Sequence, residues 1–441
     1  MICVSTRGKA PPVSLREAVL AGIAPDGGLY VPSRIDRLPD SWWDEHRGHT
    51  FQELAVALAA VLAGDEFDRD TLSSLIRDAL NFPVPIVKLD DQLSVVELFH
   101  GPTFAFKDFG ARTLARLLAL SETGAAESRA GRVEGMPGPP LTILVATSGD
   151  TGGAVAQAFH GVAGTRVVVL YPEGQVSDVQ EAQFTTLEGN VIAVAVRGSF
   201  DDCQRLAKEA FADATLKSRV RLTSANSISL GRLLPQMFYY AYAALQWPDR
   251  KLTISVPSGN FGNLVAGVMA SRLGAPIAAF SAPTTVNDTV PRYLKSGRIE
   301  PRPSVPTIAN AMDVGNPSNL ERLQWLFGGD VGAMRSLITS TAHTDHEVRA
   351  AIAELHRHYG YVADPHTAIA FLGTNPQARH AASAAQSLCF LSTAHPAKFR
   401  EVVEPAIGKT VPLPAPLAAA LARKKTVQRI GAAMNELKDL L

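Results

Sequence analysis

The chain has 441 residues, and its 42 lysines and arginines balance its 42 aspartates and glutamates, so the formal net charge is zero. That balance excludes the strongly basic surface typical of proteins that bind nucleic acids or anionic membranes. The hydrophobic content of 46% is that of an ordinary globular protein, and no apolar run reaches the roughly 18 residues that a membrane-spanning helix needs. We therefore expect a small-molecule partner, no nucleic acid and no membrane.

The cysteines and histidines predict no metal site. Cys3, Cys203 and Cys389 lie far apart, without zinc-binding spacing or a disulfide framework, and the histidines show no pattern such as H-E-x-x-H. We expect His100 and His366 to be structural, or close to a substrate, rather than metal ligands. Few cysteines favour a reducing compartment, and the opening stretch MICVSTRGKAPP carries no secretory signal, so we predict a cytoplasmic location.

Helical patterns dominate the first part of the chain. Ser14 is placed to cap a short amphipathic helix that Gly22 ends. Two further helical patterns run from about Phe51 to Ala63 and from about Asp70 to Ala79. We expect residues 1–90 to form a mostly helical N-terminal segment.

Beyond residue 90 the pattern changes to short apolar strands that alternate with helices. Strand patterns rich in β-branched residues occupy 93–98, 141–147, 165–171, 190–196 and 252–257, and a helical pattern follows each of the last four. This alternation predicts a parallel sheet covered on both faces, hence an α/β fold. We assign residues 91–400 to an α/β body of two subdomains and 401–441 to a helical tail. The Gly- and Pro-rich stretch 124–140 predicts a surface excursion to which we assign no chemistry.

Lys107 stands in an unusual setting, FHGPTFAFKDFG at 99–110, where three phenylalanines surround it. Packing against aromatic rings removes water from an amine, which lowers its pKa and makes it a better nucleophile. The alternative is that Lys107 only begins a helix and extends outward over its neighbours. This stretch alone does not decide between the two interpretations.

A turn rich in hydroxyl groups, VATSGDTGGAVAQAF at 145–159, joins a predicted strand to a predicted helix. Thr147, Ser148 and Thr151 are placed to hold a substrate carboxylate, and Asp150 is available to a cofactor hydroxyl. A plain helix-capping role for Asp150 remains the alternative. The tripeptide DTG is also found in aspartic proteases, but such a protease needs two copies and this chain has one.

A second strand-to-helix turn, VPSGNFGNLVAGVMA at 256–270, contains Gly259 and Gly262. Glycine lets the backbone approach an anion closely, and the free amides at a helix start bind it, so the turn suits a phosphate. The alternative is a tight connection without a ligand, because the dinucleotide spacing G-x-G-x-x-G is absent. An apolar lysine, a phosphate turn and an anion-binding turn together meet the needs of pyridoxal phosphate, which requires an amine, a phosphate pocket and a carboxylate site.

These motifs resemble those of the threonine synthases, within the fold type II family of pyridoxal-phosphate enzymes that also holds serine and threonine dehydratases and cysteine synthase. HGPTFAFKDFGAR, ATSGDTGGA and SGNFGN are similar to that family's lysine segment, substrate turn and phosphate loop. Five further stretches match in family order across almost the whole chain: STRG at 5–8, APDGGLYVP at 24–32, NSISLGRLLPQ at 226–236, AMDVGNPSN at 311–319 and STAHPAKF at 392–399.

The resemblance implies parallel-sheet domains with pyridoxal 5'-phosphate in the cleft between them. It implies that Lys107 bonds the coenzyme aldehyde and that Thr393 meets the pyridine nitrogen. The residues implied to hold the coenzyme phosphate are Gly259, Asn260, Phe261, Gly262 and Asn263. A threonine at the ring nitrogen does not demand a protonated ring, which favours elimination and replacement over transamination.

The implied reaction converts O-phosphohomoserine and water to threonine and phosphate. A phosphate dianion in a closed pocket needs a paired cation, and we place Arg232 there, with Ser227 as a weaker candidate. Ser229 stands where the family more commonly has asparagine. A dehydratase or other replacement enzyme of the same fold is the nearest alternative, and a non-catalytic sensor a more distant one. We expect a monomer or small homo-oligomer.

Overall fold

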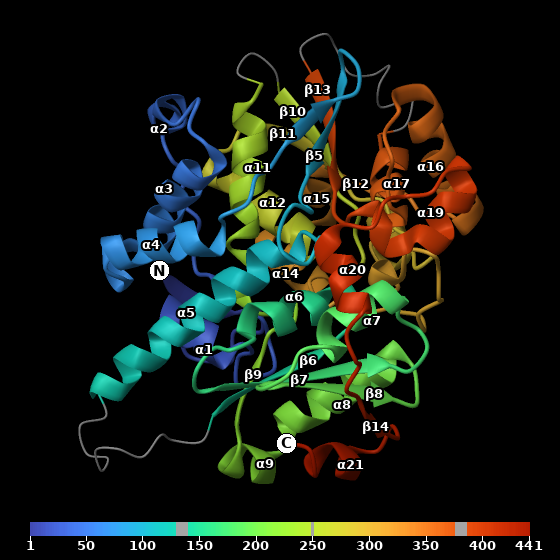
Figure 1. The fold of residues 1–441 in the computed structure, drawn as a ribbon. Coiled ribbons are helices and arrows are strands. Elements are labelled where there is room, and N and C mark those ends of the chain that lie inside the picture. Colours follow the sequence, from blue (N-terminus) through green and yellow to red (C-terminus); the bar gives the residue numbers. More distant parts are fainter. Residues whose placement is uncertain (129–139, 248–250, 375–385) are drawn as a thin grey trace.

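The structure, a computed structural model, describes residues 1–128, 140–247, 251–374 and 386–441 (Figure 1). Its strands form three sheets: a small one at the N-terminus, one of six strands and one of five. In Figure 1 the two larger sheets lie one above the other, with helices α5 and α6 between them. The predicted α/β fold built on parallel sheets is confirmed.

The N-terminal segment combines the small sheet with helices. Strand β1 (Ile2–Ser5) pairs antiparallel with β2 (Val13–Ser14) and β3 (Tyr30–Pro32). Ser14 caps helix α1 by accepting a hydrogen bond from the Glu17 amide, and Gly22 ends it, as predicted. The helices of this segment are α1 (Leu15–Ala21), α2 (Asp40–Glu45), α3 (Phe51–Ala63) and α4 (Arg69–Ala79), with the short 3-10 turn η1 (Gly64–Glu66).

The six-stranded sheet has the order β12-β11-β10-β13-β5-β4, and only β4 runs antiparallel to its neighbour. Val95 and Phe390 face a core that includes α16, α17 and α19, whereas Val96 and Leu391 face the core that includes α3, α11 and α12. Both faces of the sheet are therefore covered. The elements are β4 (Ile86–Lys88), β5 (Leu93–Glu97), β10 (Lys251–Ser255), β11 (Ile277–Ser281), β12 (Ile338–Thr339), β13 (Gln386–Ser392), α11 (Gln236–Leu245), α12 (Gly262–Leu273), α16 (Asp345–Tyr359), α17 (Pro365–Leu372) and α19 (Arg400–Ile407).

The five-stranded sheet has the order β14-β8-β7-β6-β9, and all its strands are parallel. Ile143 and Val145 pack against α6 and α7, whereas Leu144 and Ala146 face a separate core with α8 and α21. The elements are β6 (Leu141–Ala146), β7 (Thr165–Pro172), β8 (Val191–Val196), β9 (Arg221–Ser224), β14 (Gln428–Ile430), α6 (Asp150–Phe159), α7 (Asp178–Thr185), α8 (Phe200–Ala212) and α21 (Met434–Lys438).

The C-terminal segment differs from the predicted helical tail. Besides α20 (Ala415–Leu421) and α21 it contributes strand β14, which pairs with β8 and closes one edge of the five-stranded sheet. The strand has only three residues, of which Ile430 alone is buried, so no apolar pattern reveals it. The division of the chain at residues 90 and 400 stays a prediction, and residues 129–139 of the predicted excursion lie outside the described residues.

Three helices begin where the two larger sheets meet. Helix α5 (Lys107–Ser128) follows β5, α6 follows β6, and α12 follows β10, so each begins beyond the carboxyl end of a strand. In α/β folds ligands bind in the crevice at this end of the strands. None of the described helices is both long and apolar enough to cross a membrane. The remaining elements are α9 (Ala214–Arg219), α10 (Leu230–Leu233), α13 (Thr289–Ser296), η2 (Asn310–Met312), α14 (Leu320–Leu326), α15 (Val331–Leu337) and η3 (Pro396–Phe399).

Candidate active site

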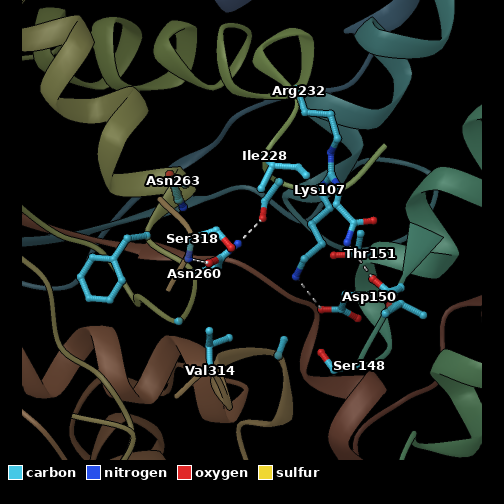
Figure 2. A pocket seen from close by; sticks show the side chains of 18 of the residues that line it. Lys107, Ser148, Asp150, Thr151, Ile228, Arg232, Asn260, Asn263, Val314 and Ser318 are labelled. Atoms are coloured by element: carbon cyan, nitrogen blue, oxygen red, sulfur yellow. Dashed lines mark hydrogen bonds and ion pairs between the residues drawn. The ribbon is translucent and has the colours of Figure 1, made fainter. Parts of the chain in front are cut away.

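A cavity of about 160 Å³ lies where α5, α6 and α12 begin (Figure 2). Every site residue predicted from the sequence lines it: Lys107, Thr147, Ser148, Asp150, Thr151, Ser227, Arg232, Gly259, Asn260, Phe261, Gly262, Asn263 and Thr393. The fold thus brings the lysine segment and the two strand-to-helix turns to one place. An apolar cleft with convergent polar groups is the usual form of a small-molecule site.

A second cavity, of about 1150 Å³, adjoins the first. The two share five lining residues, and the larger one is also lined by Arg7 of the STRG motif. The N-terminal segment therefore reaches the neighbourhood of the site. The shared residues are Ile23, Lys208, Phe211, Ile228 and Ser318.

Lys107 is the first residue of α5 and also projects into the cavity (Figure 2). Its side chain is 13% exposed, and its Nζ lies 4.9 Å from the centre of the Phe106 ring and 3.9 Å from Oδ2 of Asp150. Burial lowers the pKa of Lys107 to about 8, although the Asp150 carboxylate acts in the opposite direction. Lys107 therefore begins a helix and is also a desolvated amine, which joins the two interpretations that the sequence left open.

Asp150 is a buried carboxylate with two cationic neighbours. Its Oδ1 lies 2.6 Å from Nζ of Lys398 and accepts a hydrogen bond of 2.9 Å from Nε2 of Gln180, while its Oδ2 faces Lys107. Burial raises the pKa of Asp150, but Lys398 and Lys107 lower it by more, so the group is ionised. Sequence reasoning missed Lys398, because a single lysine in the quoted motif STAHPAKF gives no sign of being buried.

The hydroxyl of Thr147 is committed to the turn that it begins. Its Oγ1 accepts hydrogen bonds from the amides of Gly149 and Gly152 and donates one of 3.1 Å to the Gly149 carbonyl. Ser148 and Thr151 make no side-chain hydrogen bond within the described residues, so their hydroxyls are available to a ligand. Thr147 therefore shapes the turn, and its contact with a substrate carboxylate stays a prediction.

The turn before α12 has the features of an anion site. Phe261 has the left-handed φ of 60°, and α12 begins without a side-chain cap, which leaves its first amides free. A Cβ on Gly259 would lie 2.6 Å from Cα of Met312, so only glycine fits. Oδ1 of Asn263 accepts hydrogen bonds from Tyr239 and Tyr240, and its buried Nδ2 has no partner within the described residues. A bound phosphate would satisfy this donor.

Asn260 and Ser227 close the cavity wall. Nδ2 of Asn260 donates to Oγ of Ser227 at 2.6 Å, and its Oδ1 accepts from the amide of Ser318 at 2.6 Å (Figure 2). On the other side, Thr393 follows β13, and its carbonyl accepts a hydrogen bond of 2.9 Å from the amide of Phe106. That bond ties the end of β13 to the segment that carries the catalytic candidate.

Arg232 is a buried guanidinium with little protein to bind. It is 3% exposed, its Nη1 donates to the Ala225 carbonyl at 2.6 Å, and its buried Nε has no partner within the described residues. Burial lowers its pKa to about 10. Arg322 is equally buried, yet all three of its nitrogens donate to protein oxygens, Tyr30 O among them. Ser229, where the sequence departs from the family pattern, is buried and does not line the cavity.

His366 also lines the cavity and is held in one tautomer. Its Nε2 accepts a hydrogen bond of 3.2 Å from the amide of Ala311, so the ring proton is on Nδ1, which lies 2.6 Å from Oδ2 of Asp364. The sequence predicted a structural or substrate-adjacent role for His366; its bonds to Ala311 and Asp364 fit the structural role, and proximity to a substrate stays a prediction. His100 contacts Glu97 instead. Among the described residues, no group of three His, Cys, Asp or Glu side chains is arranged to hold a metal.

Family models match the chain from end to end. "Threonine synthase N terminus" matches residues 3–80, "Pyridoxal-phosphate dependent enzyme" matches 83–393, and "Threonine synthase, C-terminal" matches 367–441. The chain belongs to the threonine synthase family. Among threonine synthases, that of Serratia marcescens is 41% identical over 97% of this chain and 96% of its own. That of Escherichia coli strain K12 is 41% identical over 92% and 91%.

Solved threonine synthase structures have the same fold. The crystal structure of the Escherichia coli enzyme superposes with a TM-score of 0.91 at 38% identity and covers 100% of this chain and 99% of its own. The Brucella melitensis threonine synthase, solved with bound pyridoxal phosphate, gives a TM-score of 0.90 at 35% identity and covers 100% and 98%. A threonine deaminase from Solanum lycopersicum is 15% identical with a TM-score of 0.56, a likeness of fold alone.

The coenzyme of this threonine synthase family member is pyridoxal 5'-phosphate. The cavity fits it in three respects that do not depend on the comparisons. Lys107 offers an amine whose pKa is lowered to about 8, and the uncapped start of α12 with the unpartnered Nδ2 of Asn263 suits a phosphate. Thr393, which also lines the cavity, offers a hydroxyl.

Proposed function

We propose that this chain catalyses the conversion of O-phosphohomoserine and water to L-threonine and phosphate, the last step of threonine biosynthesis. The observation that carries the proposal is a pair of buried cations in one cavity. Lys107 suits the coenzyme, whereas Arg232 has no anion within ion-pair distance among the described residues. A buried cation without a counter-ion is costly, so a second anionic ligand is implied besides the coenzyme.

The coenzyme is held from three sides in this proposal. Lys107 bonds its aldehyde, and Gly259 to Asn263 at the start of α12 bind its phosphate through backbone amides and the Asn263 amide. Thr393 would meet the ring nitrogen of the coenzyme. Asp150 lies beside Lys107 in the same cavity. Asn260 contributes indirectly, because its side-chain amide is already hydrogen-bonded to the Ser227 hydroxyl and to the Ser318 backbone amide.

When bound, pyridoxal phosphate acts as an electron sink for negative charge that develops next to the substrate amine. Lys107 supplies the proton chemistry. Its Nζ would take the proton from the α carbon of the substrate and later return one to the same carbon. A pKa near 8 suits this task, because the amine is partly neutral near neutral pH and still returns a proton readily.

Substrate orientation comes from the two turns and from Arg232. The free hydroxyls of Ser148 and Thr151, with the first amides of α6, bind the carboxylate, and Thr147 shapes that turn. Arg232 binds the phosphate through its Nε, and the Ser227 hydroxyl is free to donate while it accepts from Asn260. Phosphate leaves the γ carbon as a proton is lost from the β carbon, the γ carbon then gains a proton, and water adds at the β carbon.

The cellular compartment and the oligomeric state belong to the same proposal. Cys3, Cys203 and Cys389 are all free and buried, which fits the cytoplasm. We retain the expectation of a monomer or small homo-oligomer.

The test is substrate choice. We expect turnover of O-phosphohomoserine, with threonine as product, and none of unphosphorylated threonine or serine. Formation of a keto acid from threonine would instead indicate the dehydratase alternative, and bound coenzyme without any turnover would indicate the non-catalytic one.

A further inference from the structure

Lys398 is a fully buried cation behind the wall of the active-site cavity, in contact with Asp150, which lines the cavity. It belongs to η3, its relative exposure is 0%, and its Nζ donates a hydrogen bond of 3.0 Å to the Thr103 carbonyl. Its other close partner is Oδ1 of Asp150, at 2.6 Å. Burying an ammonium costs several kcal/mol unless it is paired, so this lysine has a defined partner rather than a chance contact.

The two oxygens of Asp150 serve different partners. Oδ1 is fixed by Lys398 and by Nε2 of Gln180, whose own Oε1 accepts a hydrogen bond of 3.2 Å from Asn310. Oδ2 is left facing Nζ of Lys107 at 3.9 Å (Figure 2). The side of the carboxylate away from the cavity is therefore locked, while the other side is presented to the amine.

The charges that face Lys107 are balanced. From α6 and α17 come two carboxylates, Asp150 and Asp364, and from α10 and η3 come two cations, Arg232 and Lys398. Each carboxylate has a partner of its own, since Asp364 also binds His366. Asp108, buried next to Lys107 along α5, accepts two hydrogen bonds from Thr103 and acts on Lys398 and Arg232.

We propose that Lys398 is a positioning residue that acts through Asp150: it is the lasting counter-ion of this carboxylate and thereby allows Lys107 to lose its proton. Without Lys398, Lys107 would be the nearest cation to a buried carboxylate. An opposite charge within about 4–6 Å stabilises the protonated amine and raises its pKa by roughly 1–3 units. Lys398 thus supplies the positive charge that balances the Asp150 carboxylate. Lys107 therefore does not have to remain protonated to balance it.

The inference rests on the coenzyme-bonding role proposed for Lys107 and does not depend on the substrate. It is tested with the full-length protein freed of coenzyme. The rate constant for uptake of added pyridoxal phosphate is followed by absorbance from about pH 6 to about pH 10, because only neutral Lys107 reacts. Lys107→Ala, which should bond no coenzyme, separates failure of the Lys107 role from failure of the inference.

Four proteins are compared. Lys398→Met, which keeps the length of the side chain without its charge, should move the midpoint upward by roughly one pH unit or more relative to the unsubstituted chain. The double variant Lys398→Met with Asp150→Asn should have a midpoint at or below that of the unsubstituted chain, because the carboxylate that favours the ammonium form has gone as well. Lys438→Met, which breaks an ion pair with Asp213 that does not line the cavity, should leave the midpoint unchanged.

An unchanged midpoint in folded Lys398→Met would overturn the inference. So would an upward shift of equal size in the double variant, since the effect would then not pass through Asp150. If Lys398→Met fails to fold, the inference is tested with Asp150→Asn alone. It leaves Lys398 repelling Lys107, so its midpoint should fall, and a midpoint that stays or rises would contradict the inference.

Discussion

Nζ of Lys107 and Oδ2 of Asp150 lie 3.9 Å apart, although the two residues begin different helices that follow strands of different sheets. Lys107 follows β5 of the six-stranded sheet, and Asp150 follows β6 of the five-stranded one. Their contact therefore joins the two halves of the α/β body at the cavity. The protonation state of the amine depends on groups from both halves.

The lowered pKa of Lys107 predicts how coenzyme uptake depends on pH. Burial favours the neutral amine, with a pKa of about 8, so the uptake rate should rise by about tenfold per pH unit below that value and level off above it. Stopped-flow absorbance of the coenzyme-free protein measures this directly. A midpoint near the ordinary lysine value, about 10.4, would show that the amine is not desolvated.

Gly259 should be the least replaceable residue of the phosphate turn. In Gly259→Ala the new methyl group would lie 2.6 Å from the backbone of Met312, so one of the two segments must shift, at a cost of roughly 1–3 kcal/mol. We expect weaker coenzyme binding in equilibrium dialysis and a lower urea midpoint. Gly262→Ala is the matched variant, because the closest neighbour of its methyl is the Asn319 side chain, at 3.2 Å, and no backbone atom comes nearer than 3.6 Å, so its loss of affinity should be smaller. Equal coenzyme affinity in both variants would contradict the steric argument.

Arg232 should affect substrate more than coenzyme. Arg232→Gln removes the cation proposed to pair with the substrate phosphate, and kcat/KM should fall by roughly a hundredfold. Because Arg232 also lowers the pKa of Lys107, coenzyme uptake should shift to higher pH, but it should change little at a pH where Lys107 is neutral in both proteins. Arg112→Gln is the control, because Arg112 is a partly buried arginine of α5 that donates to the carbonyls of Ala79 and Asp78 and does not line the cavity. It should lower the urea midpoint without a comparable loss of kcat/KM. Similar losses of kcat/KM in the two variants would remove Arg232 from the phosphate site.

Local sequence patterns predicted much of the fold. The predicted helix from Phe51 to Ala63 is observed with the same bounds, because its capping threonine and its terminal glycine are both visible in the sequence. Strands β5, β6, β7 and β8 are mostly buried on both faces, which marks them in the sequence as apolar runs. Strands β4, β9, β11 and β12 were not predicted. Strand β14 was not predicted, because two of its three side chains are exposed. Its position is set by its pairing with β8 rather than by its own residues.

The sequence predicted which residues line the candidate site, but it did not predict the hydrogen bonds and ion pairs among them. The two turns and Lys107 stand in recognisable stretches, and all line one cavity. That Lys398 is buried against Asp150 depends on where η3 packs, and that Thr147 has no free hydroxyl depends on the shape of its turn. Such contacts join residues far apart in the chain or follow from exact turn geometry, so neither composition nor spacing reveals them.

The most direct measurement is product stoichiometry from O-phosphohomoserine, with phosphate and threonine quantified in the same reaction beside Lys107→Ala. The account predicts equal amounts of the two products from the unsubstituted chain and neither from the variant, which should still fold because Lys107 is at the first position of α5. Phosphate accompanied by a keto acid instead of threonine, or undiminished turnover in Lys107→Ala, would contradict it.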